Sequence, residues 1–248
     1  MIPDSPARPL LSVVIPVFNE RGTIEKVLDR VAAAPFDKEM VVVDDASLDG
    51  TRDFLVGVAR GETVYRDGAG QPVPVRVFFE PSNRGKGAAL RRGFTEARGE
   101  IVLVQDADLE YDPADYPALL EPILEGMADV VYGSRFLGGP QRAHLFWHSV
   151  GNRVVTLMSN MMTNLNLTDM ETCYKVFRRE VIDEIGPTLR SDRFGIEPEI
   201  TAKVARRGFR VYETPISYYG RDYTAGKKIT WKDGVAAIYH IIRYRLRD

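Results

Sequence analysis

The stretch IVLVQDADLE, residues 101–110, joins an apolar run to three carboxylates at alternate positions, Asp106, Asp108 and Glu110. Four consecutive apolar residues are typical of a strand that is buried on both faces of a parallel sheet. Successive strand side chains point to opposite faces, so an extended chain would place the three carboxylates on one side. Such crowding of like charges predicts a cation between them. The alternative is a solvated strand end before a turn at residues 112–113.

The rest of the chain repeats the unit of buried strand followed by helix. We expect strands at residues 10–18, 39–47, 75–82, 101–108, 128–136 and 210–218. We expect helices at residues 21–34, 50–60, 85–98, 115–126, 146–165, 197–207 and 231–246, with an inserted turn or hairpin at 61–74. The stretch TDMETCYKVFRREVIDEI (168–185) receives no assignment. This alternation predicts an α/β fold in which helices flank a Rossmann-like, doubly wound and mostly parallel sheet.

Length and composition narrow the possibilities further. The 248 residues fit one domain at 10–248 behind a loose leader at 1–9, since no linker or repeat divides them. The net charge of −2 gives no argument for a nucleic-acid partner. The single cysteine, Cys173, excludes an intramolecular disulfide and suits a reducing cytoplasm. We find neither a signal peptide nor an apolar window of about 18–20 residues that would span a membrane.

Polar residues follow several of the predicted strands at the edge where open α/β sheets bind ligands. They are Pro16, Asn19 and Glu20 after the first strand, Asp44 and Asp45 after the second, and Asp106 and Asp108 after the fourth. Converging carboxylates suit Mg²⁺ or Mn²⁺, and such a cation commonly bridges a pyrophosphate. For Asp44 and Asp45 the alternative is a helix N-cap through a turn at residues 47–49. A receiver-type phosphoacceptor module also has this acidic pattern, but it needs only about half of this length.

The segments VVIPVFNE, VVVDDASLDGT, NRGKGAALRRGF, DADLE and GSRF, in this order and spacing, resemble the family 2 glycosyltransferases of the GT-A fold. Within that family the chain is most similar to the dolichyl- or polyprenyl-phosphate hexose synthases of the mannosyl and glucosyl types. The resemblance covers nearly all of residues 11–246. It implies a nucleotide-sugar-binding half at 10–136, an acceptor-binding half at 137–248, and inversion at the anomeric carbon.

The resemblance also implies roles for individual residues. The nucleotide sugar is expected to bind Pro16, Phe18, Glu20, Val43, Asp45, Lys86, Asp106, Ala107, Asp108, Arg221, Lys227 and Lys228. Asp106 and Asp108 match the family's metal-binding Asp-X-Asp motif, and Glu110 would complete the shell around Mg²⁺ or Mn²⁺. The expected catalytic residues are Asp108, Arg135 and Asp169. The glycines around Lys86 allow either a phosphate cradle or a plain helix entry, although the pattern is not that of a P-loop.

The acceptor decides whether a general base is needed. A lipid phosphate is already anionic near neutral pH, because the second pKa of a phosphate monoester is about 6. A hydroxyl acceptor, in a soluble molecule or a polysaccharide, would instead require a base, for which Asp169 is the candidate. The remaining alternatives are a nucleotidyltransferase, which usually has a glycine-rich loop where this chain has PVFNE, and a nucleotide-binding module without activity.

The expected partners are a nucleotide sugar, either GDP-mannose or UDP-glucose, and a polyprenyl or dolichyl phosphate. Residues 231–246 predict an amphipathic helix with Trp231, Val235, Ile238, Ile242 and Leu246 near one face and basic residues beside them. Such a helix either packs on its own domain or lies in a lipid headgroup layer. The Met-rich helix at 146–165 could extend the same surface. We therefore expect a cytoplasmic protein, peripheral at the inner face of the membrane; the oligomeric state is not indicated.

Overall fold

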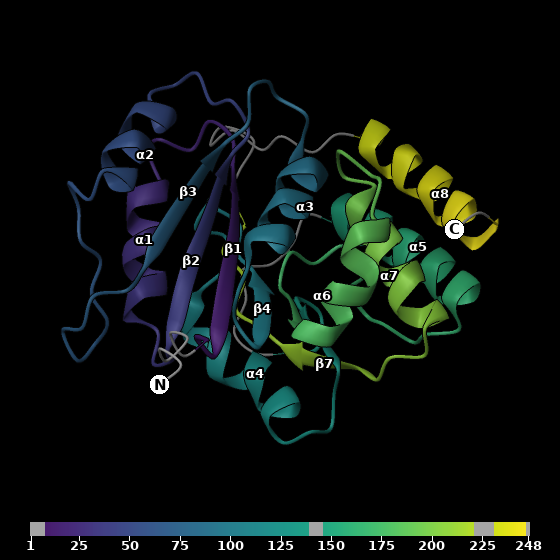
Figure 1. Ribbon diagram of the computed structural model, residues 1–248. Helices are drawn as coiled ribbons and strands as arrows, with labels where there is room; N and C mark the ends of the chain where they lie inside the picture. The colour runs from purple at the N-terminus through teal and green to yellow at the C-terminus, as the bar shows by residue number, and fades with distance from the viewer. Residues whose placement is uncertain (1–7, 139–145, 221–230, 247–248) are drawn as a thin grey trace.

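The computed structural model describes residues 8–138, 146–220 and 231–246, and these form one mixed sheet covered by helices (Figure 1). The strands are β1 (Leu11–Val17), β2 (Lys38–Asp44), β3 (Val75–Phe79), β4 (Ile101–Val104), β5 (Val130–Ser134), β6 (Lys175–Arg178) and β7 (Val211–Pro215). The helices are α1 (Ile24–Ala33), α2 (Thr51–Ala59), α3 (Lys86–Glu96), α4 (Tyr116–Leu124), α5 (Phe146–Thr163), α6 (Arg179–Ile185), α7 (Ile196–Arg206) and α8 (Trp231–Leu246). Two short 3₁₀ helices, Pro113–Asp115 and Gly186–Thr188, complete the described part.

The sheet is mostly parallel, as the sequence predicts. Its strand order is β3-β2-β1-β4-β6-β5-β7. The pairs β1 with β2, β1 with β4, β2 with β3 and β5 with β7 are parallel, whereas β6 runs antiparallel to both of its neighbours. The α/β fold class and the single domain are therefore confirmed.

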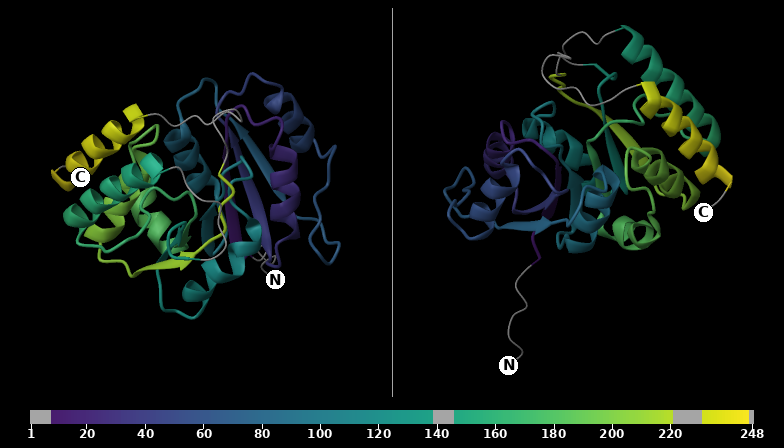
Figure 2. Two further views of the ribbon diagram at one scale, coloured as in Figure 1. Left: turned by 180° about the vertical axis from the view of Figure 1, so that it is seen from behind. Right: turned by 90° about the horizontal axis from the view of Figure 1, so that it is seen from above.

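Helices cover both faces of the sheet, which explains why its central strands are buried along their whole length. Every residue of β1, β2 and β4 is buried. Helices α1 and α2 lie on one face and α3 on the other (Figure 1). Helices α5, α7 and α8 pack against one another beside the β6-β5-β7 half, with α5 and α8 side by side (Figure 2). No helix in the described ranges is both long and apolar enough to cross a bilayer.

Two expectations about the elements were wrong or incomplete. The strand expected at 101–108 ends at Val104, because the chain turns before the carboxylates. The stretch 168–185, which received no assignment, contains β6 and α6. The insertion at 61–74 is a small hairpin, as predicted, in which Arg66 bridges Pro72.

Candidate active site

The acidic stretch after β4 is a turn and not the extension of a strand. Leu109 has a φ of 64°, in the left-handed region, and the carboxylate of Asp108 accepts a hydrogen bond from the Glu110 amide at 3.1 Å. The side chain of Glu110 accepts a hydrogen bond from the Tyr218 hydroxyl at 2.8 Å. The expectation of three carboxylates aligned on one extended strand was therefore wrong, because the turn gives each of them different surroundings.

Lys86, the first residue of α3, is ion-paired with the first of these carboxylates. Its Nζ lies 3.0 Å and 3.2 Å from the two oxygens of Asp106 and 3.2 Å from Oε1 of Glu197 on α7. Burial alone would lower the pKa of Lys86, but the surrounding negative groups, Asp106 first, outweigh it and hold the pKa well above 10.5. Lys86 therefore remains a cation and links the carboxyl edge of β4 to α7.

The glycines on either side of Lys86 lie against the backbone of residues 191–193. A Cβ on Gly85, whose φ is 106°, would lie 2.6 Å from the carbonyl oxygen of Asp192. A Cβ on Gly87 would overlap the Ser191 carbonyl oxygen, and the Ala88 amide donates to Asp192 at 3.0 Å. The backbone at residues 191–193 thus covers the start of α3. A nucleotide role for this segment would depend on the Lys86 side chain.

Asp45 organises the loop that leads into α3. Its buried carboxylate accepts hydrogen bonds from the Asn83 side chain at 2.7 Å, the Arg84 amide at 2.8 Å and the Gly85 amide at 2.7 Å. The neighbouring Asp44 accepts from the Ser47 amide at 3.2 Å, which is the turn considered as the alternative for this pair. Asp45, which we expected to bind the nucleotide sugar, thus holds the loop before α3 in place.

The loop after β1 contacts the loop after β2. The Asn19 amide donates to Ser47 Oγ at 2.9 Å, and the Glu20 amide donates to Thr51 Oγ1 at 3.0 Å. Phe18 and Glu20 are partly buried at this edge. Pro16 and Val43 are partners in the β1–β2 register and are both buried in the sheet.

Ala107 connects this edge to β4, because its carbonyl accepts from Thr23 Oγ1 at 2.7 Å. Ala107 itself is buried. The predicted nucleotide-binding residues of β1, β2 and β4 therefore meet at the carboxyl ends of these strands, and some of them, such as Val43, lie within the core.

Arg135 and Asp169, which were predicted as separate catalytic residues, form a bidentate ion pair beyond β5. The guanidinium donates to the two Asp169 oxygens at 2.6 Å and 2.8 Å, and the Arg135 amide donates at 3.1 Å. Asn152 of α5 donates to the same carboxylate at 3.2 Å. Asp169 is fully buried, while the guanidinium lies over the Tyr218 ring at 5.2 Å. Every oxygen of Asp169 therefore already accepts hydrogen bonds.

The described residues contain no group of three His, Cys, Asp or Glu side chains that could hold a metal ion. The proposed shell of Asp106, Asp108 and Glu110 therefore stays a prediction. Two carboxylates nevertheless fit Mg²⁺, which proteins commonly bind through one or two carboxylates together with substrate phosphates. Arg221, Lys227 and Lys228 lie outside the described residues.

Sequence reasoning missed two glutamates near this edge. Glu197 begins α7 and contacts Lys86, and Glu171 follows Asp169 by two residues. Burial, and next the charge of Glu197, together raise the pKa of Glu171 to about 8, although Lys175 and Arg135 oppose this effect. The signal available in the sequence was the pair of acids in IEPEI, at the start of an otherwise amphipathic helix.

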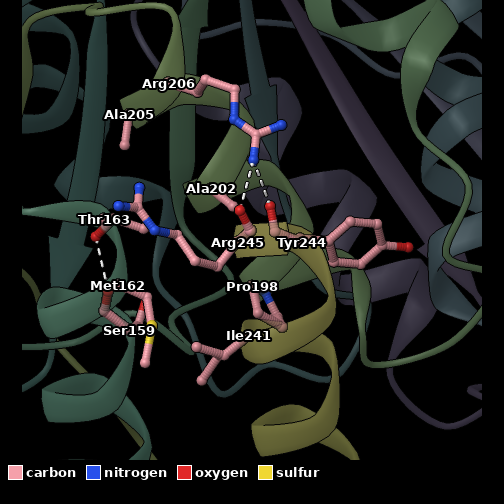
Figure 3. Close-up of a pocket in the computed structure, with 10 residues that line it drawn as sticks. All are labelled: Ser159, Met162, Thr163, Pro198, Ala202, Ala205, Arg206, Ile241, Tyr244 and Arg245. Carbon is pink, nitrogen blue, oxygen red and sulfur yellow. Dashed lines mark hydrogen bonds between the residues drawn. The ribbon is translucent and has the colours of Figure 1, made fainter. Parts of the chain in front are cut away.

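Two hollows lie beside helix α5. A cavity of about 110 Å³ between α5, α7 and α8 includes Arg206, whose guanidinium donates to the carbonyls of Tyr244 and Arg245 at the end of α8 (Figure 3). It contains none of the predicted site residues. A groove of about 320 Å³ lies along α5. Its lining residues are Phe136, Arg153, Thr156, Leu157, Asn160, Leu167 and Thr168. Two of these lining residues, Phe136 and Thr168, are the sequence neighbours of Arg135 and Asp169.

Comparison with known proteins places these observations in context. Residues 12–186 match the family described as glycosyl transferase family 2. The chain is 31% identical over 220 residues to the polyprenol monophosphomannose synthase of Mycolicibacterium smegmatis, covering 87% of this chain and 79% of that one. It is 31% identical over 221 residues to the undecaprenyl-phosphate mannosyltransferase of Micrococcus luteus, covering 86% and 85%.

A solved structure has a similar fold. Glucosyl-3-phosphoglycerate synthase from Mycobacterium tuberculosis, in complex with Mn²⁺, uridine diphosphate and glucosyl-3-phosphoglycerate, superposes with a TM-score of 0.70 at 21% identity. The match covers 96% of this chain and 79% of that one. At this level of identity the likeness concerns the fold, which agrees with the predicted GT-A architecture.

Proposed function

The chain belongs to glycosyl transferase family 2 and is a hexosyltransferase, and from this premise we propose that it transfers a hexose from a nucleotide sugar to a polyprenyl or dolichyl phosphate. GDP-mannose and UDP-glucose are the proposed donors. Relatives whose names state polyprenol and undecaprenyl-phosphate mannosyl transfer support this acceptor class. The reaction breaks the bond between the anomeric carbon and the diphosphate, and a phosphate oxygen of the lipid forms the new bond with inversion.

The donor is proposed to bind at the carboxyl ends of β1, β2 and β4. Asp106 and Asp108 would hold Mg²⁺ or Mn²⁺, and when bound the cation would stabilise the negative charge that develops on the leaving diphosphate. Lys86, whose ammonium lies 3.0 Å from Asp106, would bring a second positive charge to the same diphosphate. Asp45 would act indirectly, by holding the loop at residues 83–85 in place.

The acceptor phosphate is proposed to approach Arg135. A lipid phosphate needs no general base, because its attacking oxygen is already ionised near neutral pH. The bonding of Asp169 agrees with this, since its oxygens accept from Arg135 and Asn152 and are not free to take a proton without breaking these bonds. We therefore assign Asp169 a positioning role, in which it orients the guanidinium of Arg135.

The surface of α5 is the observation that carries the choice of a lipid acceptor. Four apolar side chains repeat along one side of this helix at spacings of seven, three and four residues, and all are at least 47% exposed. They are Trp147, Val154, Leu157 and Met161. Leu157 also lines the groove that contains Phe136 and Thr168, the chain neighbours of Arg135 and Asp169. An apolar surface that continues into the site suits an acceptor with a hydrocarbon tail.

The same surface supports a peripheral position on the membrane, which we propose to be the cytoplasmic side. On α8, Ala237, Ile241 and Tyr244 are buried against the domain, so the alternative of a docked terminal helix is confirmed. Ile242, which we expected on the apolar face of this helix, is 42% exposed. Arg243 and Arg245 are exposed beside it and could contact anionic lipid.

The test is transfer of radiolabelled hexose from GDP-mannose and from UDP-glucose to undecaprenyl phosphate in the presence of Mn²⁺. We expect a labelled lipid product from one of these donors and none with free undecaprenol, which offers a hydroxyl in place of the phosphate. Labelling of free undecaprenol or of a polysaccharide acceptor, without labelling of the lipid phosphate, would replace this proposal with a hydroxyl-acceptor transferase.

A further inference from the structure

Glu197 is buried and Glu171 is partly buried, and each has a buried carboxylate oxygen without a hydrogen-bond partner among the described residues. Glu197, which is 5% exposed, directs Oε1 to Lys86 at 3.2 Å and leaves Oε2 buried and unpaired in the described part of the protein. Glu171 likewise has a buried Oε1 that makes no hydrogen bond there. An unsatisfied buried polar atom is costly, so native proteins leave few of them without a ligand or an ordered water.

The surroundings place the two carboxyl groups between the reacting halves. Glu197 is joined through Lys86 to Asp106, on the side proposed for the diphosphate. Glu171 follows Asp169 by two residues, and Asp169 is paired with Arg135, so Glu171 belongs to the segment on the acceptor side. A transferred sugar must occupy the space between these two sides, because its anomeric carbon is bonded first to the diphosphate and then to the acceptor.

The chemistry of the pair suits a neutral ligand with hydroxyl groups. Burial, and next the charge of Glu197, raise the pKa of Glu171 to about 8, so Glu171 keeps its proton near neutral pH. A protonated carboxyl donates a hydrogen bond, an ionised one accepts, and a sugar hydroxyl can do both. A metal ion suits the place less well, because the cationic side chains of Lys86 and Lys175 already act on Glu197.

We propose that Glu171 and Glu197 together recognise hydroxyl groups of the transferred hexose. This inference rests on the proposed function, because it assumes a nucleotide sugar whose hexose lies between Asp106 and Arg135. The unpaired Oε2 of Glu197 accepts from one hydroxyl, and Glu171 exchanges a hydrogen bond with another. The two residues thereby help to decide which hexose is accepted.

Calorimetry with matched ligands tests the proposal. Each protein is titrated, with Mn²⁺ present, with GDP-mannose and GDP and with UDP-glucose and UDP. The variants are Glu171→Met and Glu197→Met, since Met keeps the length of the side chain without its polar atoms. Glu184→Met, which removes an exposed glutamate paired with Arg207, is the control. We expect each site variant to bind the nucleotide sugar about ten- to a hundredfold more weakly, with the affinity for the nucleoside diphosphate unchanged.

The outcomes separate this inference from the proposed function. Equal weakening of the nucleotide sugar and the nucleoside diphosphate would overturn the inference and assign the glutamates to the diphosphate side. Unchanged affinity for both ligands would overturn it as well, and would mean that ordered water satisfies the two oxygens. Failure of the unaltered protein to bind any of the four ligands would overturn the proposed function itself.

Discussion

Three residues other than glycine adopt left-handed backbone angles just after the strands that end at the candidate site. Asn19, Ala46 and Leu109 have φ values of 54°, 60° and 64°. Such conformations cost about 1–3 kcal/mol each and persist only where the surroundings enforce them. Here the Asn19 side chain accepts from the Leu48 amide at 2.8 Å and so fixes the loop after β1 to the loop after β2. The shape of this edge is therefore held by specific local bonds.

Asp108→Asn is expected to abolish nearly all transfer while leaving the fold intact. The amide oxygen can still accept from the Glu110 amide, so the turn survives. Removing one of two neighbouring negative charges relieves repulsion, so the melting temperature without metal should hold or rise. Transfer assays and thermal unfolding in EDTA measure both effects. Full activity of this variant in EDTA would refute the metal site.

Glu171→Gln should change how stability depends on pH. Burial, and next the charge of Glu197, raise the pKa of Glu171 to about 8. The charge of Asp169 adds to this effect, and the cations Lys175 and Arg135 oppose it. Between pH 4.5 and about 8 the folded protein therefore keeps a proton that the unfolded chain has lost. Stability must fall with rising pH across this window. A glutamine does not ionise, so the stability of Glu171→Gln should not show this fall with rising pH.

The measurement is the melting temperature of both proteins at pH 5 and pH 8. We expect the difference, variant minus unaltered protein, to be larger at pH 8. Glu184→Gln, at an exposed position, is the control and should show no such change. An equal difference at the two pH values would mean that Glu171 ionises normally in the folded protein.

At the scale of elements, the start of α3 shows how a helix is fitted to its neighbour. Glycine inside a helix normally costs about 0.5–1 kcal/mol relative to alanine. Gly151 of α5 has open space around its Cβ position, so Gly151→Ala should stabilise by that amount. At Gly87 a Cβ would overlap the Ser191 carbonyl, so Gly87→Ala should destabilise by about 1–3 kcal/mol.

Thermal unfolding of the two alanine variants compares these expectations directly. A change of 1 kcal/mol corresponds to about 2–4 °C in a protein of this size. Gly87→Ala should also weaken nucleotide binding, because displacing the start of α3 moves Lys86 away from Asp106. A melting temperature for Gly87→Ala that equals that of Gly151→Ala would show that the 191–193 backbone yields at little cost.

The apolar periodicity and the turn residues of the sequence predicted most of the helices and strands. The helices have clear apolar faces, and the early strands contain apolar runs. The segment with β6 and α6 escaped prediction for a physical reason. Lys175 begins β6 and is buried, with its ammonium donating to the carbonyls of Met170 and Thr172. A lysine inside the sheet looks like a loop residue until its partners are known. The antiparallel pairing of β6 likewise arises from tertiary contacts that no local pattern encodes.

The candidate site was predictable where strand ends carry acidic residues, and not where long side chains meet from distant segments. Asp106 and Arg135 follow strands, so their edge could be inferred from topology. The contact of Lys86 with Glu197 joins α3 to α7 across 111 positions of sequence, and local periodicity contains no information about it. The pairing of Arg135 with Asp169 was missed for the same reason, although both residues were expected to be catalytic.

At the scale of the whole molecule, the sheet and the second-half helices present different surfaces. The nucleotide-side edge lies at the ends of β1, β2 and β4, whereas α5 and α8 lie side by side beyond the other half of the sheet (Figure 2). Exposed apolar residues on α5 include Trp147 and Leu157, and α8 adds Tyr239 and Ile242. Arg243 and Arg245 lie on the same terminal helix. An apolar area bordered by cations is the composition of a surface that rests on anionic lipid.

Salt-sensitive binding to anionic liposomes is therefore expected, and co-sedimentation measures it. Each arginine near the lipid surface contributes about 1 kcal/mol, so Arg243→Gln with Arg245→Gln should weaken binding about thirtyfold at low salt. Leu157→Ser should weaken it at every salt concentration, because it removes apolar contact and no charge. Leu124→Ser, an exposed leucine on α4, is the control and should bind normally. Lys227, Lys228 and Lys232 are expected to add to the attraction. Changing them to Gln together with the two arginines should therefore weaken binding further. Failure of the unaltered protein to co-sediment at low salt would separate the acceptor site from any lipid surface and favour a water-soluble acceptor.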